Sequence, residues 1–136
     1  MDLDEAREFV RGNAHTVLAT LKRDGTPQLT PVNAVVDDEG WLVICSRETA
    51  FKVKNVRREP RVWLCVLPDA FYGAFVQVEG TADVLSLPDA MEPLVDYYRR
   101  AAGEHPDWDD YRAAMVRDQR CLIRITPAEV GPTVAG

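Results

Sequence analysis

The sequence predicts a mainly β protein of the α+β class, built as a closed or nearly closed barrel of six antiparallel strands with short helices inserted between them. Three observations predict this fold. Segments rich in β-branched and apolar residues recur along the chain, separated by turn signals such as Asp24-Gly25. Residues 74–85 alternate between two faces with a period of two, as in a strand. Residues 91–102 instead place their apolar side chains at helical spacing.

A chain of 136 residues is long enough for one domain with a core of its own. No internal repeat, low-complexity stretch or linker interrupts it. We therefore predict a single domain over residues 1–136, with an N-terminal helix at 2–12, the barrel at about 15–127 and a short C-terminal tail at 128–136.

The N-terminal third predicts one helix followed by a three-stranded meander. Asp2, with Glu5 three residues later, has the spacing of a helix cap and its reciprocal partner. Pro27 and Pro31 have no N–H to give to a ladder, so the strand that contains them should be bulged or lie at a sheet edge. The three strands are expected at residues 15–22, 28–36 and 41–46.

Three more helices and three more strands complete the expected pattern. Thr49, Asp89 and Asp107 each precede a helical stretch and are expected to cap it. Pro60 should end the first of these helices. Gly80 inside a strand predicts a bulge or a close backbone approach. The strands are expected at residues 62–67, 74–85 and 121–125, the last closed by Thr126-Pro127.

The charge distribution gives the first indication of function. The chain has a formal net charge of -6, which argues against general nucleic-acid binding. Residues 47–61 nevertheless hold six cations and two anions, a local balance of +4. Such a basic island suits one anionic small molecule, although a charge run of this kind is also typical of a solvated helix face. The six cations are Arg47, Lys52, Lys54, Arg57, Arg58 and Arg61.

Several classes of protein are disfavoured by what the sequence lacks. The acidic N-terminus has no signal-peptide pattern, and no apolar run approaches the ~20 residues of a membrane span, so we expect a cytoplasmic protein without membrane contact. The three cysteines and two histidines have no metal-ligand spacing, so no metal is expected. No nucleotide-binding or hydrolase motif is present. If the protein is an enzyme, a bound cofactor should supply its chemistry.

Three runs of sequence resemble one known family. VLATLKRDGTPQLTPVN, FKVKNVRREPRVWLCV and VQVEGTADV are similar to the pyridoxamine 5'-phosphate oxidase-like split β-barrel proteins. More narrowly, they resemble the flavin/deazaflavin oxidoreductases of the B group, which use coenzyme F420. AGEHPDWDDYRAAM followed by CLIRI is similar to the small actinobacterial F420-binding members. The resemblance covers residues 9–127 and implies a split β-barrel.

The resemblance also implies a homodimer whose cofactor ring lies in a groove between two barrels. The phosphate pattern falls on Lys52, Lys54 and Asn55, with Arg58 and Arg61 as flanking cations. The strand segment that lines the ring falls on Gln28, Thr30, Pro31 and Val32. Spacing agrees for the first set, because residues three apart on a helix can reach one phosphate. The resemblance identifies no catalytic residue.

The function implied is transfer of a hydride from reduced F420 to an electrophilic small molecule, such as an unsaturated carbonyl or lactone. Two alternatives remain open at this point. One is an FMN-dependent oxidoreductase of the same fold, similar to pyridoxamine phosphate oxidase, and the other is a non-catalytic F420 carrier. Aromatic residues in or near strands favour a dimer interface. These residues are Trp41, Trp63, Phe71, Tyr72 and Phe75.

Overall fold

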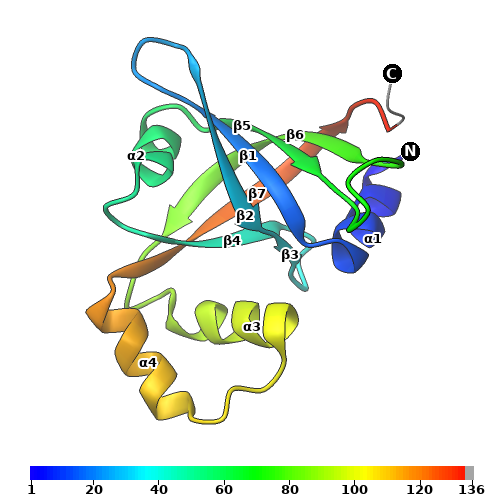
Figure 1. Cartoon of the computed structure of the whole chain (residues 1–136). Helices are drawn as coiled ribbons and strands as arrows, with labels where there is room; N and C mark the ends of the chain where they lie inside the picture. The colour runs from blue at the N-terminus through cyan, green and yellow to red at the C-terminus, as the bar shows by residue number, and fades with distance from the viewer. Residues whose placement is uncertain (134–136) are drawn as a thin grey trace.

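The computed structural model describes residues 1–133, which form one sheet of seven antiparallel strands and four helices (Figure 1). The strands follow the order β2-β1-β5-β6-β7-β4-β3. Only Ala34 separates β2 from β3 in the chain, although the two strands lie at opposite ends of this order. The sheet must therefore curl on itself, which makes it a split barrel. The strands are β1 (His15–Leu21), β2 (Pro27–Asn33), β3 (Val35–Val36), β4 (Leu42–Arg47), β5 (Arg61–Val66), β6 (Val76–Leu85) and β7 (Arg120–Val130).

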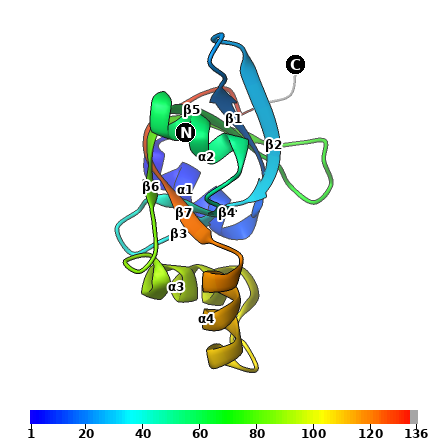
Figure 2. The ribbon, with the colours of Figure 1, turned by 90° about the vertical axis from the view of Figure 1, so that its left-hand side faces the viewer.

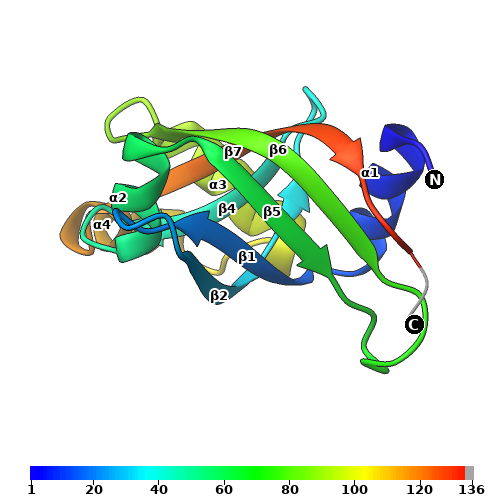
Figure 3. The ribbon, with the colours of Figure 1, turned by 90° about the horizontal axis from the view of Figure 1, so that it is seen from above.

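Two helices lie at opposite ends of the barrel, α1 (Leu3–Gly12) and α2 (Phe51–Arg58), as the view from above shows (Figure 3). Their buried residues join the barrel interior in one core: Ala6 and Val10 from α1, and Val53 and Val56 from α2. A second core lies on the other face of β4 and β7. It is covered by α3 (Met91–Ala102) and α4 (Trp108–Arg117), which contribute Leu94 and Tyr111 (Figure 1).

The structure confirms two of the predicted helix caps and corrects two. The Asp2 side chain accepts from the Glu5 N–H in a complete capping box, and Asp107 accepts from the Asp110 N–H. Thr49 and Asp89 do not cap: α2 and α3 begin after Ala50 and Ala90, with no side-chain cap bond. In both cases the residue with the capping side chain stands one position too early.

The expected meander is wrong, because the segment predicted as one strand at 28–36 divides at Ala34. Its first part, β2, pairs with β1, and its second part, β3, pairs with β4. β4 then pairs with β7, far along the chain, and not with β2. Ala34, Val35 and Val36 are all buried. Ala34 and Val36 pack in the barrel core, and Val35 packs in the core under α3 and α4, so the chain changes its strand partner here and the strand count rises from six to seven.

The two prolines of β2 confirm the edge alternative. Pro27 and Pro31 stand opposite Leu21 and Val17 in an uninterrupted register, and β2 is the first strand of the sheet order. The ladder of β1 and β2 therefore tolerates both residues without a bulge, because β2 has a strand partner on one side only.

The last strand continues beyond Thr126-Pro127, which were expected to close it. β7 reaches Val130, so the barrel takes up the first three residues assigned to the C-terminal tail, while residues 134–136 of that tail lie outside the described part. The predicted irregularity at Gly80 explains the continuation. The register shifts between Glu79 and Gly80, and Gly80 faces Pro127. The bulge thus accommodates a proline within the ladder.

Candidate functional site

The largest hollow associated with the predicted site is lined by residues of α2 and of the hairpin of β1 and β2. Figure 2 shows α2 beside these two strands. Its volume is about 1150 Å³. Five of its lining residues are cations and only one, Asp24, carries a carboxylate. We call it the basic hollow; its lining residues are Lys22, Arg23, Asp24, Gln28, Phe51, Lys54, Asn55, Arg57 and Arg58.

Asn55 organises this hollow from beneath. It is 5% exposed, and its amide nitrogen donates to Thr20 Oγ1 at 3.1 Å and to Gln28 Oε1 at 2.8 Å. Its amide oxygen accepts from Arg58 at 3.0 Å, and Arg58 also donates to the Leu21 carbonyl at 2.6 Å. One buried amide therefore ties α2 to β1 and β2. Both of its N–H groups are used, so Asn55 positions Gln28 and Arg58 in the hollow and has no donor left for a phosphate.

The two lysines of the predicted phosphate pattern lie on different sides of α2. Lys54 is exposed in the basic hollow, with its Nζ 5.6 Å from the centre of the Phe51 ring. Lys52 is half-buried and is absent from the lining of that hollow. Burial raises the pKa of the Cys45 thiol, and the positive charges of Arg120 and Lys52 oppose this rise.

The flanking cations of the pattern also separate. Arg58 lines the basic hollow, whereas Arg61 does not. The Arg61 guanidinium bonds to Glu59 at 2.7 Å and lies 5.9 Å from the Trp63 ring centre. Sequence reasoning missed Lys22 and Arg23 as site residues, although the KRDG turn that carries them is a visible cluster of charge at a hairpin tip.

The four predicted β2 residues divide between two faces and two hollows. Gln28, Thr30 and Val32 alternate on the half-buried face, and Pro31 lies on the exposed one. Gln28 lines the basic hollow, whereas Pro31 and Val32 line a second hollow of about 510 Å³. Val32 lies four positions along the strand from Gln28, a distance of about 13 Å. β2 thus runs from one hollow to the other, with Thr30 midway and in the lining of neither; we call the half-buried face of β2 the β2 wall.

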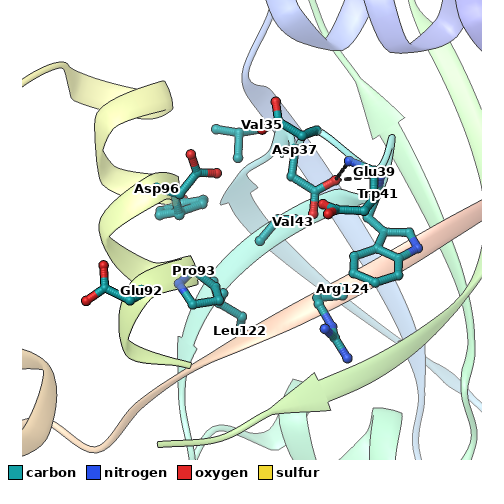
Figure 4. A pocket seen from close by; sticks show the side chains of 12 residues that line it. Val35, Asp37, Glu39, Trp41, Val43, Glu92, Pro93, Asp96, Leu122 and Arg124 are labelled. Atoms are coloured by element: carbon teal, nitrogen blue, oxygen red, sulfur yellow. Dashed lines mark hydrogen bonds between the residues drawn. The ribbon is translucent and has the colours of Figure 1, made fainter. Parts of the chain in front are cut away.

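A third hollow, of about 350 Å³, has the opposite charge (Figure 4). Its walls are apolar at Val35, Val43 and Leu122, but five of its lining residues carry carboxylates and only Arg124 is a cation. The Asp37 carboxylate points inward and accepts from the backbone N–H groups of Glu39 and Trp41, drawn as dashed lines in Figure 4. Burial raises the pKa of Asp37, while these hydrogen bonds oppose the rise. An anionic ligand is therefore better suited to the basic hollow.

The structure gives one finding on membranes: within residues 1–133, none of the helices has both the length and the apolar character that crossing a bilayer requires. α3, the longest of them, has 12 residues.

Several proteins of known structure are similar to this chain in fold. The conserved hypothetical protein Rv2991 from Mycobacterium tuberculosis is 27% identical, covers 96% of this chain and 82% of its own, and superposes with a TM-score of 0.78. A protein named F420 reductase is 21% identical, with 92% and 94% covered and a TM-score of 0.71. HutZ, a heme storage protein from Vibrio cholerae, is 17% identical, with 98% and 96% covered and a TM-score of 0.72.

At these identities the last two proteins share the fold, and their different names show that the fold alone does not decide the activity. The model of a protein family adds a match along the sequence. The family described as Pyridoxamine 5'-phosphate oxidase matches residues 3–133, nearly the whole chain. This chain therefore belongs to the pyridoxamine 5'-phosphate oxidase family and has its split-barrel fold.

Proposed function

We propose that this protein is a cytoplasmic F420-dependent oxidoreductase that passes a hydride from the reduced deazaflavin to an electrophilic small molecule and works as a homodimer. The observation that carries the proposal is the basic hollow of a protein of net charge -6: five cations and one carboxylate line it, and within residues 1–133 only Arg57 of the five forms an ion pair, with Glu48 outside the hollow. An acidic protein that concentrates positive charge in one concave site is suited to a small polyanion.

The donors in the hollow fit the anionic part of F420. This cofactor carries a phosphate and, beyond it, a lactyl-oligoglutamate tail with several carboxylates. Lys54 and Arg58 extend from α2, and Lys22 and Arg23 from the facing hairpin, so cations flank the hollow on two sides. FMN ends at one phosphate and needs fewer of them. The excess of charge favours the longer anion.

The β2 wall fits the neutral part of the same molecule. Gln28 is held by Asn55, so its amide is fixed at the edge of the basic hollow. Thr30 and Val32 continue the half-buried face of β2 towards the second hollow. When bound, the reduced deazaflavin supplies the hydride; these residues orient the ring and the acceptor, which is the contribution expected of a protein that relies on a cofactor.

The outer face of β2, β1 and β5 is apolar and is suited to contact with a second copy of the chain. Cross-strand neighbours on β2, β1 and β5 form two apolar rows, Leu29–Ala19–Trp63 and Pro31–Val17–Cys65. Leu29 is 66% exposed, and the rows end at polar residues of β6. Trp63 and Cys65 of β5 are also only half-buried within the described chain. Because Pro31 also lines the second hollow, a dimer through this face would complete the site.

Anaerobic assays with reduced F420 test the proposal. The protein is mixed with a panel of unsaturated ketones, aldehydes and lactones, and cofactor oxidation is followed by absorbance while fluorescence titration reports F420 binding. We expect tight binding and turnover with at least one acceptor class. Binding without turnover across the panel would favour the carrier, and turnover only with FMN would favour the FMN-dependent enzyme.

A further inference from the structure

The second hollow contains a cation, Arg120, that forms no ion pair with any carboxylate of the described residues. Arg120, the first residue of β7, lines this hollow together with Cys45 of β4 and Tyr97 of α3. Val17, Val32 and Leu67 make much of the remaining wall apolar, and none of the lining residues carries a carboxylate. Tyr97 donates its hydroxyl to the Asn33 carbonyl at 2.9 Å, so this polar group already has a partner.

Arg120 differs from the other arginines of residues 1–133. Nine of them form an ion pair with a carboxylate. The remaining four are Arg23, Arg47, Arg58 and Arg120, of which the first three are exposed and only Arg120 is half-buried. Its Nε is buried and has no hydrogen-bond partner within the described residues.

An unpaired cation is costly at such a position. Removing a guanidinium from water without a counter-charge disfavours the folded state, and a buried N–H without an acceptor adds to that cost. A carboxylate offsets both, because its two oxygens match the planar fork of donors that a guanidinium presents. The geometry therefore suits a carboxylate that comes from outside the described chain.

We propose that Arg120 binds a carboxylate on the electrophilic substrate, so that the acceptors of this protein are anionic unsaturated carbonyl compounds. This inference rests on the proposed function, since β2 runs from the cofactor hollow to the hollow of Arg120. Val32 of β2 lines that hollow, about 13 Å along the strand from Gln28. Arg120 would thus hold the remote end of a substrate whose reactive carbons lie towards the β2 wall.

The test uses a matched pair of probes that needs no turnover. Binding of 4-oxopentanoate and of its methyl ester to the full chain is measured by isothermal titration, with and without F420. We expect the acid to bind more tightly than the ester. Arg120→Gln should weaken binding of the acid roughly 10- to 100-fold and leave the ester unchanged, and Arg120→Lys should restore part of the loss.

Arg117→Gln is the matched control, because it removes the same charge from an exposed side chain at the end of α4. It should leave both probes unaffected, and circular dichroism verifies that each variant folds. With 4-oxopent-2-enoate as acceptor, Arg120→Gln should raise KM and change kcat little. The reason is that the contact between Arg120 and the carboxylate would stabilise the bound substrate and the transition state equally.

Other results would overturn the inference. Equal affinity of wild-type protein for acid and ester, or an equal loss of both in Arg120→Gln, would show that Arg120 binds no substrate carboxylate. If Arg120→Gln instead lowered the dimer mass in light scattering, the counter-charge would belong to the partner subunit. If F420 did not bind but the protein still bound the acid more tightly than the ester through Arg120, the proposed function would be wrong and the carboxylate site would stand.

Discussion

Single residues in α2 have roles that follow from their position around the helix. Asn55 is buried and forms three hydrogen bonds, Lys54 is exposed in the basic hollow, and Lys52 is half-buried outside that hollow. Successive residues of a helix differ by 100°, so the neighbours of a buried residue face different surroundings. The resemblance grouped these three residues as one phosphate pattern, and the structure separates them into a structural residue and two cations on different sides.

The separation predicts unequal effects of removing cations. The double variant Lys54→Ala/Arg58→Ala should weaken F420 binding roughly 10- to 100-fold at low salt, since both residues line the basic hollow. Arg61→Ala should cost less, because Glu59 already engages that guanidinium. Fluorescence titration measures each affinity, and Arg99→Ala on α3 is the control for a lost surface charge. A larger loss in Arg61→Ala than in the double variant would contradict this assignment.

Glu48 predicts a pH dependence of stability. Burial raises the pKa of its carboxyl, but hydrogen bonds from Ser86 at 2.6 Å and Arg57 at 2.7 Å outweigh burial and hold the pKa below 4.5. A carboxyl whose pKa is lower in the folded state stabilises the fold above its unfolded value and loses this effect as the pH falls through the folded one. Glu48→Gln should therefore be less stable than wild type at pH 7, with the difference shrinking below pH 4.5. Urea unfolding across this range checks it; a constant difference would argue against the assignment.

At the scale of elements, local signals predicted most helices and strands but not their partners. The capping box of α1, the cap of α4 and the edge position of β2 follow from residues next to each element. The division at Ala34 has no local signal, because it depends on β4 pairing with β7 about 80 residues later. Thr49 and Asp89 fail as caps for a similar reason: the apolar faces of α2 and α3 set where each helix begins.

The bulge between β6 and β7 predicts that alanine at Gly80 lowers stability much more than alanine at Gly12. A Cβ at Gly80 would lie 2.4 Å from the Thr126 carbonyl oxygen, a backbone atom that cannot move aside without breaking the ladder. Gly80→Ala should lower the free energy of unfolding by about 2 kcal/mol or more. Gly12→Ala is the control, since nothing lies within 4 Å of its added Cβ and a small gain is expected. Equal stability of the two variants in urea would contradict the bulge geometry.

The sequence predicted only part of the candidate site, because the packing of helices and strands decides which residues meet there. The resemblance identified Gln28, Lys54 and Arg58, which the structure brings into one hollow. Lys22 and Arg23 were missed because they lie close to α2 only when the hairpin of β1 and β2 packs beside this helix. Arg120 was missed because it lies outside the matched motifs, and its lack of a partner is visible only once the chain is folded.

At the scale of the whole molecule, the apolar outer face of β2, β1 and β5 predicts self-association. Leu29→Arg places a charge on the β2 side of this face, where Leu29 is 66% exposed, and should convert a dimer to a monomer. Val116→Arg makes the same change at a residue 60% exposed on α4, outside this face, and should leave the dimer intact. Light scattering at micromolar concentration measures both masses. A wild-type monomer, or a dimer that survives Leu29→Arg, would place the interface elsewhere.

The molecule is acidic overall but gathers cations in the basic hollow. This distribution of charge supports the central claim, that the basic hollow binds F420 in preference to FMN. The measurement that tests it most directly is side-by-side fluorescence titration of both cofactors at low and high salt. Exposed cations act on a long anion through screened electrostatics, so we expect F420 to bind more tightly than FMN, with a preference that shrinks as salt rises. Tighter binding of FMN at both salt concentrations would contradict the claim and identify an FMN-dependent protein.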